Sequence, residues 1–222
     1  MNDLTPRAPK HHIPTILTFE QAKALLAEVR WADLELLLKL ALTTGMRLNE
    51  LRGLRWSDLD FAEGTLQVNR MLRYATETSW SIEPPKTPAE QREIWLTTSM
   101  CTALQQHSNR KQEQCAGVEP VSPDDDYVFT RSPGNPLQQG DVIHSFDAEK
   151  KRIGLAQLLF HDLRPSAALF FLVLGVPLHV GATILGYPPS KEAGTEHVPI
   201  QPSEIKDALE KLDKALSLDD EL

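Results

Sequence analysis

The chain has few cysteines and no long apolar segment. Only two of its 222 residues are cysteine, Cys101 and Cys115, which is too few for the disulfide framework of a small secreted domain. The longest apolar run covers residues 167–176 and is too short to cross a bilayer, and no apolar signal segment stands at the N-terminus. We therefore expect a cytoplasmic protein with no membrane partner.

The chain also lacks an excess of positive charge. It has 23 basic and 31 acidic residues, which gives a formal net charge of −8 at pH 7. Because nucleic-acid affinity depends largely on neutralising phosphates, this charge argues against nucleic-acid binding, although a basic cleft can lie on an acidic body. The hydrophobic content of 41% is that of a globular protein and excludes a disordered or fibrous one.

The hydrophobic pattern predicts a mostly helical chain. Thr18 and Gln21 form a capping box that begins one helix. Residues 33–44 are apolar nearly all round, which predicts a buried helix that ends at Gly45. Further helices are expected at residues 48–54, 99–117, 141–153 and 166–174 and between Pro177 and Gly186. Ser203 is expected to cap a last, amphipathic helix.

Between these helices the pattern changes to that of strands, at residues 65–70, 80–83 and 92–96. The last two flank a proline-rich segment, which we interpret as a hairpin loop that carries Lys86. The expected fold class is α+β and mostly α-helical, with a small antiparallel three-stranded sheet packed against a helical body. We divide the chain into a flexible N-terminal arm (1–17), a central domain (18–200) and a C-terminal amphipathic helix with an acidic tail (201–222).

Four segments stand in an order that resembles one enzyme family. They are TTGMRLNEL around Arg47, PPKT with Lys86, FHDLRPSAA with His161 and Arg164, and LGY ending at Tyr187. Over residues 17–198 the chain resembles the catalytic domain of the tyrosine recombinases, the phage integrase family, because two arginine boxes occur in order with a lysine segment between them. The resemblance implies that fold, double-stranded DNA as the partner, and DNA integration or site-specific recombination for a phage or mobile element.

The chemistry of this family explains why such side chains are grouped. Its members attack a DNA phosphodiester with a tyrosine hydroxyl and form a 3′-phosphotyrosyl link, so negative charge collects on the non-bridging oxygens. By resemblance, Arg47 and Arg164 hold that charge, Lys86 protonates the leaving oxygen, and His161 takes the nucleophile's proton or holds an oxygen. Tyr187 stands at the family's second histidine or tryptophan position. No cofactor and no metal ion is expected, because the guanidinium groups supply the positive charge and no histidine pair, including that at 11 and 12, predicts a metal site.

The chain departs from the family pattern most clearly at the nucleophile. The tyrosine is expected about nine residues after Tyr187, where the sequence reads KEAGTEHVPI. Alignment on the His-Val pair puts Thr195 at that position, and counting from Tyr187 puts Glu196 there. An aliphatic hydroxyl is far less acidic than a phenol, whose pKa is about 10, and threonine is much shorter. We therefore expect impaired catalysis, in a lone catalytic-type domain without the helical domain that usually precedes it in the family.

Three functions stay open at this point. The chain is a strand-exchange integrase or the catalytic fragment of one, a degenerate recombinase that binds DNA and regulates or competes with an active relative, or an interaction module with no DNA role. The charge of −8 and the amphipathic C-terminal helix favour the third function. That helix docks either on its own core or on a neighbouring copy, which would make a homo-oligomer. Whether a partner supplies the missing tyrosine is also open.

Overall fold

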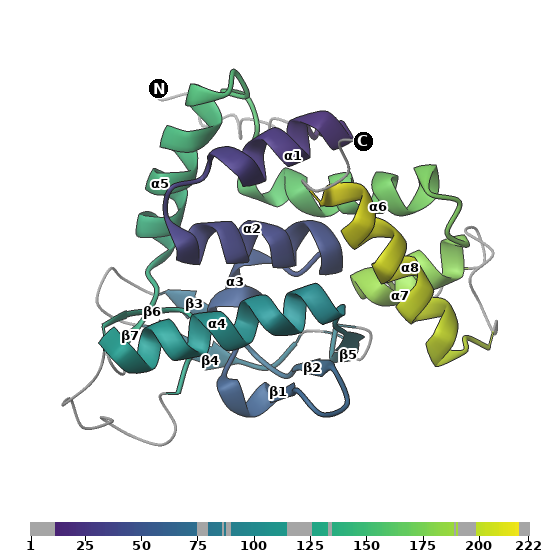
Figure 1. Cartoon of the computed structure of the whole chain (residues 1–222), viewed down its shortest axis with the longest axis horizontal. Helices are drawn as coiled ribbons and strands as arrows, with labels where there is room; N and C mark the ends of the chain where they lie inside the picture. The colour runs from purple at the N-terminus through teal and green to yellow at the C-terminus, as the bar shows by residue number, and fades with distance from the viewer. Residues whose placement is uncertain are drawn as a thin grey trace, which may run out of the picture.

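The structure is a computed structural model that describes residues 12–74, 80–85, 87, 90–114, 126–132, 135–188, 190 and 199–217. Its most buried helix is α2 (Ala32–Thr44), which runs through the middle of the molecule (Figure 1). Its leucine and alanine side chains are at most 5% exposed at Leu34, Leu36, Leu37, Leu38, Leu40, Ala41 and Leu42. The predicted buried helix is confirmed, because a helix that is apolar on all sides must be covered on all sides.

Five longer helices cover α2. They are α1 (Phe19–Glu28), α4 (Thr98–Gln114), α5 (Gln139–Arg152), α6 (Leu163–Val173) and α8 (Pro202–Leu216), and each contacts α2. In Figure 1, α1 lies above α2, α4 below it and α5 to its left, and α7 (Leu178–Leu185) and α8 lie to the right. Among the described residues, no helix is both long and apolar enough to span a membrane.

The local signals at most helix ends are confirmed. The Thr18 Oγ1 atom accepts a hydrogen bond from the Gln21 backbone N–H, and the Gln21 side chain accepts one from the Thr18 N–H, which completes the capping box at α1. Gly45 ends α2 in the left-handed conformation, with a φ of 63°. Gly186 ends α7 in the same way, with a φ of 68°. Glycine adopts this conformation without the strain that a Cβ atom would bring.

The predicted cap of the last helix is wrong. Gln201, not Ser203, is the N-cap residue of α8, and Pro202 occupies the first helical position. Proline suits that position because its missing N–H would have no partner within the helix. The Gln201 backbone N–H donates instead to the Glu204 carboxylate, at 2.8 Å.

The described strands form small antiparallel sheets, but they do not pair as expected. The three-stranded sheet has the order β1 (Leu59–Asp60), β2 (Thr65–Val68), β5 (Arg92–Trp95). Two-stranded sheets join β3 (Met71–Tyr74) to β4 (Trp80–Glu83) and β6 (Thr130–Ser132) to β7 (Asn135–Pro136). The α+β class is confirmed, whereas the hairpin expected between residues 80–83 and 92–96 is wrong. The unforeseen strand β3 pairs with β4 and leaves β2 to pair with β5, so the segment that includes Lys86 connects two sheets.

Both terminal segments contact the central domain where they are described. Residues 1–11 of the predicted arm and residues 218–222 of the acidic tail lie outside the described residues. Leu17 is buried, and its backbone N–H donates to the Ser166 Oγ atom of α6 at 3.1 Å. The apolar stripe of α8 is buried in the same chain, at Ala208, Leu209, Leu212 and Leu216. Its contacts are with α1, α2, α6, α7 and β5.

Candidate phosphate-binding site

Arg47 lies at the joint between α2 and α3 (Leu48–Arg52), where it is the N-cap residue of α3. Its side chain is 43% exposed, and its Nη1 atom lies 3.0 Å from a carboxylate oxygen of Glu50 and 3.0 Å from one of Glu90. The Arg47 backbone N–H also donates to Glu50, at 3.0 Å. Two carboxylates, one three residues away and one from a distant segment, therefore fix the direction of this guanidinium group.

Arg164 stands in the first turn of α6 and is 8% exposed. Its Nη1 atom donates to the Gly45 carbonyl oxygen at 2.8 Å, which ties the second arginine box to the end of α2. The centre of its guanidinium group lies 4.6 Å from the centroid of the Tyr187 ring, within the range of a cation–π contact. Its Nη2 atom is buried and has no hydrogen-bond partner in the described part of the chain. A buried donor without a hydrogen-bond partner costs about 1–3 kcal/mol, so an acceptor from a bound ligand would be favoured at this atom.

His161 lies in the short 3₁₀ helix η3 (Phe160–Asp162), directly before α6. Its side chain is 65% exposed, and its Nε2 atom lies 3.6 Å from an oxygen of the buried Asp162 carboxylate. Pro165 follows Arg164 in the first turn of α6, where proline is compatible with a helix. Pro165 therefore does not prevent the helix from forming, although the family usually has a basic residue at this position.

A single pocket of about 520 Å³ brings Arg47, His161 and Arg164 together. The three side chains come from the N-terminus of α3, from η3 and from α6, and residues of α5 also line the pocket. The other residues that line the pocket are Met46, Leu48, Gln139, Ile143, Phe146, Asp147, Lys150, Leu159 and Phe160. Lys86, Thr195 and Glu196 lie outside the described residues, so the structure gives no position for them.

The charges behind this pocket form a compact network. Arg92 is buried, and its guanidinium group lies 3.3 Å from the Glu50 carboxylate and donates to the Ile184 carbonyl oxygen. Burial lowers the pKa of Arg92 from its ordinary value; Glu50 opposes this effect, while the positive charges of Arg164 and Arg47 lower the pKa further. The three arginines are thus close enough to repel one another. An anion bound between them would relieve that repulsion.

Two charged side chains of this region, Glu90 and Lys150, are not among the site residues predicted from the sequence. Lys150 is buried, lies 2.7 Å from Asp147 and donates to the Leu158 carbonyl oxygen. One signal for it is its spacing of four residues from Phe146, which places it on the buried stripe of α5. For Glu90 no local signal exists, because its contact with Arg47 joins residues that are far apart in the sequence.

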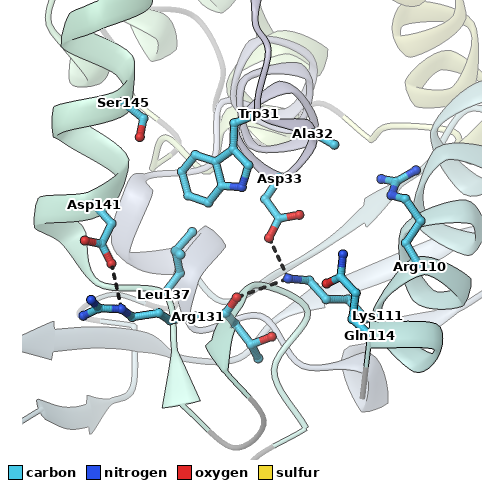
Figure 2. Close-up of a pocket in the computed structure, with 11 residues that line it drawn as sticks. Trp31, Ala32, Asp33, Arg110, Lys111, Gln114, Arg131, Leu137, Asp141 and Ser145 are labelled. Carbon is cyan, nitrogen blue, oxygen red and sulfur yellow. Dashed lines mark hydrogen bonds and ion pairs between the residues drawn. The ribbon is translucent and has the colours of Figure 1, made fainter. Parts of the chain in front are cut away.

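A second pocket, shown in Figure 2, has a different character. It measures about 460 Å³ and lies between the start of α2, the end of α4 and α5. Two of its three basic side chains are paired with acidic ones: Lys111 lies 2.7 Å from Asp33, and Arg131 lies 3.7 Å from Asp141. Among the described residues that line this pocket, none has a buried donor without a hydrogen-bond partner, as Arg164 has at Nη2, so it is a poorer anion site than the one at Arg47 and Arg164.

Curated relatives of the chain are named as recombinases and transposases. A XerC-like tyrosine recombinase of Caldanaerobacter subterraneus subsp. tengcongensis is 29% identical over 221 residues, which cover 93% of this chain and 56% of the relative. The transposase of transposon Tn916 of Enterococcus faecalis is 29% identical over 136 residues, which cover 57% of this chain and 32% of the relative. The chain therefore spans about half or less of the length of these proteins.

Solved structures show the same fold. A fragment of the Tn1549 transposon integrase in complex with transposon right end DNA has a TM-score of 0.68 at 21% identity, over 91% of this chain and 67% of that one. The XerA recombinase has a TM-score of 0.62 at 18% identity, over 88% of this chain and 64% of that one.

The model of the phage integrase family matches residues 15–196, which include both arginine boxes. Since this match spans most of the chain, and the fold agrees with it, the protein belongs to the phage integrase family.

Proposed function

We propose that this chain binds double-stranded DNA as a recombinase domain that holds one backbone phosphate between Arg47 and Arg164. The observation that carries the proposal is the Arg164 guanidinium group, which is buried beside the pocket with an Nη2 donor that lacks a partner in the described residues. A phosphate oxygen is an acceptor that such a planar donor group binds well. We also propose that the protein is cytoplasmic, as the sequence predicts.

The proposed roles follow from the chemistry of phosphoryl transfer. Arg47 and Arg164 stabilise the negative charge that grows on the non-bridging oxygens, and the exposed imidazole of His161 binds an oxygen or takes a proton. We assign Lys86 the role of general acid. Tyr187 holds the Arg164 guanidinium group through its ring, and its hydroxyl is the weakest of the proposed phosphate contacts.

We further propose that the chain does not cleave DNA on its own, because Thr195 or Glu196 stands where the family has its tyrosine. A nicked suicide DNA substrate tests this step, since a nucleophilic attack leaves a covalent protein–DNA adduct. We expect no adduct with the natural chain and an adduct with Thr195→Tyr. An adduct formed by the natural chain would show that another residue, or another copy, supplies the nucleophile.

The binding step is tested separately by measuring DNA affinity across a salt series. Arg164→Lys keeps the charge but loses the planar donor fork, so we expect weaker binding with a similar salt dependence. Arg47→Ala removes one phosphate contact and should reduce the slope of log K against log salt by about 0.9. Arg131→Ala, at the Arg131–Asp141 ion pair in the pocket of Figure 2, is the matched control and should change neither quantity. Binding that does not depend on salt, or that Arg131→Ala weakens equally, would reject the proposal.

A homo-oligomer is a second candidate, favoured by apolar side chains at the surface of α6 and the start of α7. Leu172 is 54% exposed, Val173 64% and Leu178 59%. Such side chains are common at protein interfaces when they are contiguous. Light scattering at several concentrations tests this candidate: Leu172→Gln should reduce the mass of an oligomer, and a natural chain that stays monomeric would exclude it.

A further inference from the structure

One group of side chains joins the N-terminal segment to the second arginine box. The His12 Nε2 atom lies 2.7 Å from Asp162 Oδ1, and the His161 Nε2 atom lies 3.6 Å from the same oxygen. The two imidazole rings meet edge to face, with centroids 4.8 Å apart. Each of the three residues thus offers a donor atom, and these atoms lie within 4.8 Å of one another.

The surrounding backbone holds this group in place. Asp162 is completely buried, and its Oδ2 atom accepts a hydrogen bond from the Leu159 N–H at 2.9 Å, which leaves Oδ1 directed at the histidines. The Ser166 hydroxyl donates to the Asp162 carbonyl oxygen and accepts from the Leu17 N–H, so it anchors the segment that carries His12. A carboxylate with one oxygen fixed by a backbone donor has the outer-shell support that metal ligands commonly have.

We propose that His12, His161 and Asp162 form a binding site for a divalent transition-metal ion, with zinc as the best fit. Two imidazole nitrogens and one carboxylate oxygen favour zinc and its neighbours over magnesium or calcium, which prefer oxygen ligands alone. Zinc bonds of about 2.0–2.2 Å in tetrahedral geometry place neighbouring donors about 3.3 Å apart. The two separations from Asp162 Oδ1, 2.7 and 3.6 Å, lie on either side of that value, and the two imidazole nitrogens lie within 4.8 Å of each other, so the exposed imidazoles would rotate toward each other to complete the site.

The remaining coordination position faces solvent, because both histidines are exposed while the carboxylate is buried. Three protein ligands and one open position suit a bound water molecule or an anion. The metal would hold residues 12–17 against η3 and α6 and would engage His161 at the rim of the phosphate pocket. Metal binding itself does not depend on the proposed DNA function, and it can be measured without DNA.

The test is calorimetric titration of the full chain with zinc chloride in a buffer without phosphate. We expect one high-affinity site per chain, with binding at least about 10-fold weaker in His12→Ala and in His161→Ala, as the loss of one of three ligands requires. His144→Ala is the matched control, since His144 is an exposed histidine of α5 outside the cluster, and it should bind as the natural chain does. Asp162→Asn is less informative, because this buried residue also accepts the Leu159 N–H.

Cobalt provides a second measurement, because its visible absorption reports the ligand field directly. Cobalt added to the natural chain should give an absorption band that His12→Ala abolishes and His144→Ala keeps. Absence of zinc binding, or zinc binding that His12→Ala leaves unchanged, would overturn the proposal and leave the contact between His12 and Asp162 as a hydrogen bond only. If zinc bound instead through the free thiol of Cys101, both histidine variants would bind zinc as the natural chain does. That result would also count against the proposed site.

Discussion

The contact between Glu90 and Arg47 predicts that one carboxylate weakens DNA binding by this chain. The Glu90 oxygen lies 3.0 Å from the Arg47 Nη1 atom, with 13% of the Glu90 side chain and 43% of the Arg47 side chain exposed. A phosphate that binds to Arg47 must therefore share it with a carboxylate already there. Glu90→Gln removes the competing charge and keeps the shape of the side chain.

The size of the effect follows from the exposure of the pair. Two unit charges 4 Å apart attract by about 4 kcal/mol at an effective dielectric constant of 20. Because Arg47 is nearly half exposed, solvent screening reduces this to about 1 kcal/mol, which corresponds to roughly fivefold tighter DNA binding in the variant. Arg47 already makes its phosphate contact in the natural chain and keeps its ion pair with Glu50, so the slope of log K against log salt should change little.

The assay is DNA binding by fluorescence anisotropy across a salt series, with Glu93→Gln as the control. Glu93 is an exposed residue of β5, and its substitution changes the net charge by the same amount. Tighter binding in Glu90→Gln alone supports the competition between carboxylate and phosphate. Equal gains in both variants would show a general charge effect. Weaker binding in Glu90→Gln would refute the reasoning, because it would mean that Glu90 orients Arg47 for the phosphate rather than competing with it.

Three further predictions concern stability, measured as the free energy of unfolding in urea. Gly45→Ala should lower the free energy of unfolding by about 2–4 kcal/mol, because the residue has a φ of 63° and a Cβ atom there would lie 2.1 Å from a Leu185 methyl group. An unchanged free energy would show that α2 can end in another way. Leu212→Ala should lower it by about 2–5 kcal/mol, since Leu212 is completely buried between α8 and the core, and a loss below 1 kcal/mol would indicate that α8 is loosely docked. Burial lowers the pKa of the His107 imidazole, although its hydrogen bond to the Val128 carbonyl oxygen opposes the shift. As the pH falls below about 6.5, His107 therefore binds a proton in the unfolded chain but not in the folded chain, and the free energy of unfolding should fall by up to about 1.4 kcal/mol per pH unit. His107→Gln should reduce this pH dependence. If the natural chain showed no such dependence, the burial argument would be contradicted.

The helices could be predicted because their signals are local. The capping box at Thr18, the glycine at position 45 and the apolar character of residues 33–44 each act within a few residues of one another, and all three are confirmed. The sheet could not be predicted in the same way. Strand pairing depends on which distant segment is free to pair, and nothing in residues 80–83 indicates that β3 rather than β5 is their partner.

The candidate site, too, could be predicted only in part. Arg47, His161 and Arg164 were found through short motifs, and the structure adds that they line one pocket. The contacts that modify them could not be read from the sequence. Glu90 contacts Arg47, and His12 contacts Asp162, a residue 150 positions away, because the fold brings separate segments together and no spacing rule describes that.

The electrostatic balance of the pocket explains how a chain with a net charge of −8 can hold an anion. The network contains three arginines, Arg47, Arg92 and Arg164, and two carboxylates, Glu50 and Glu90, so its formal charge is +1. The acidic residues that set the net charge lie mainly elsewhere, in the second half of the chain, and charges farther than about 8 Å are largely screened at physiological salt. A phosphodiester carries one negative charge, so a single DNA phosphate neutralises the network, whereas a more highly charged anion would leave an excess. In the proposed function, the charge of this network therefore matches that of a single backbone phosphate.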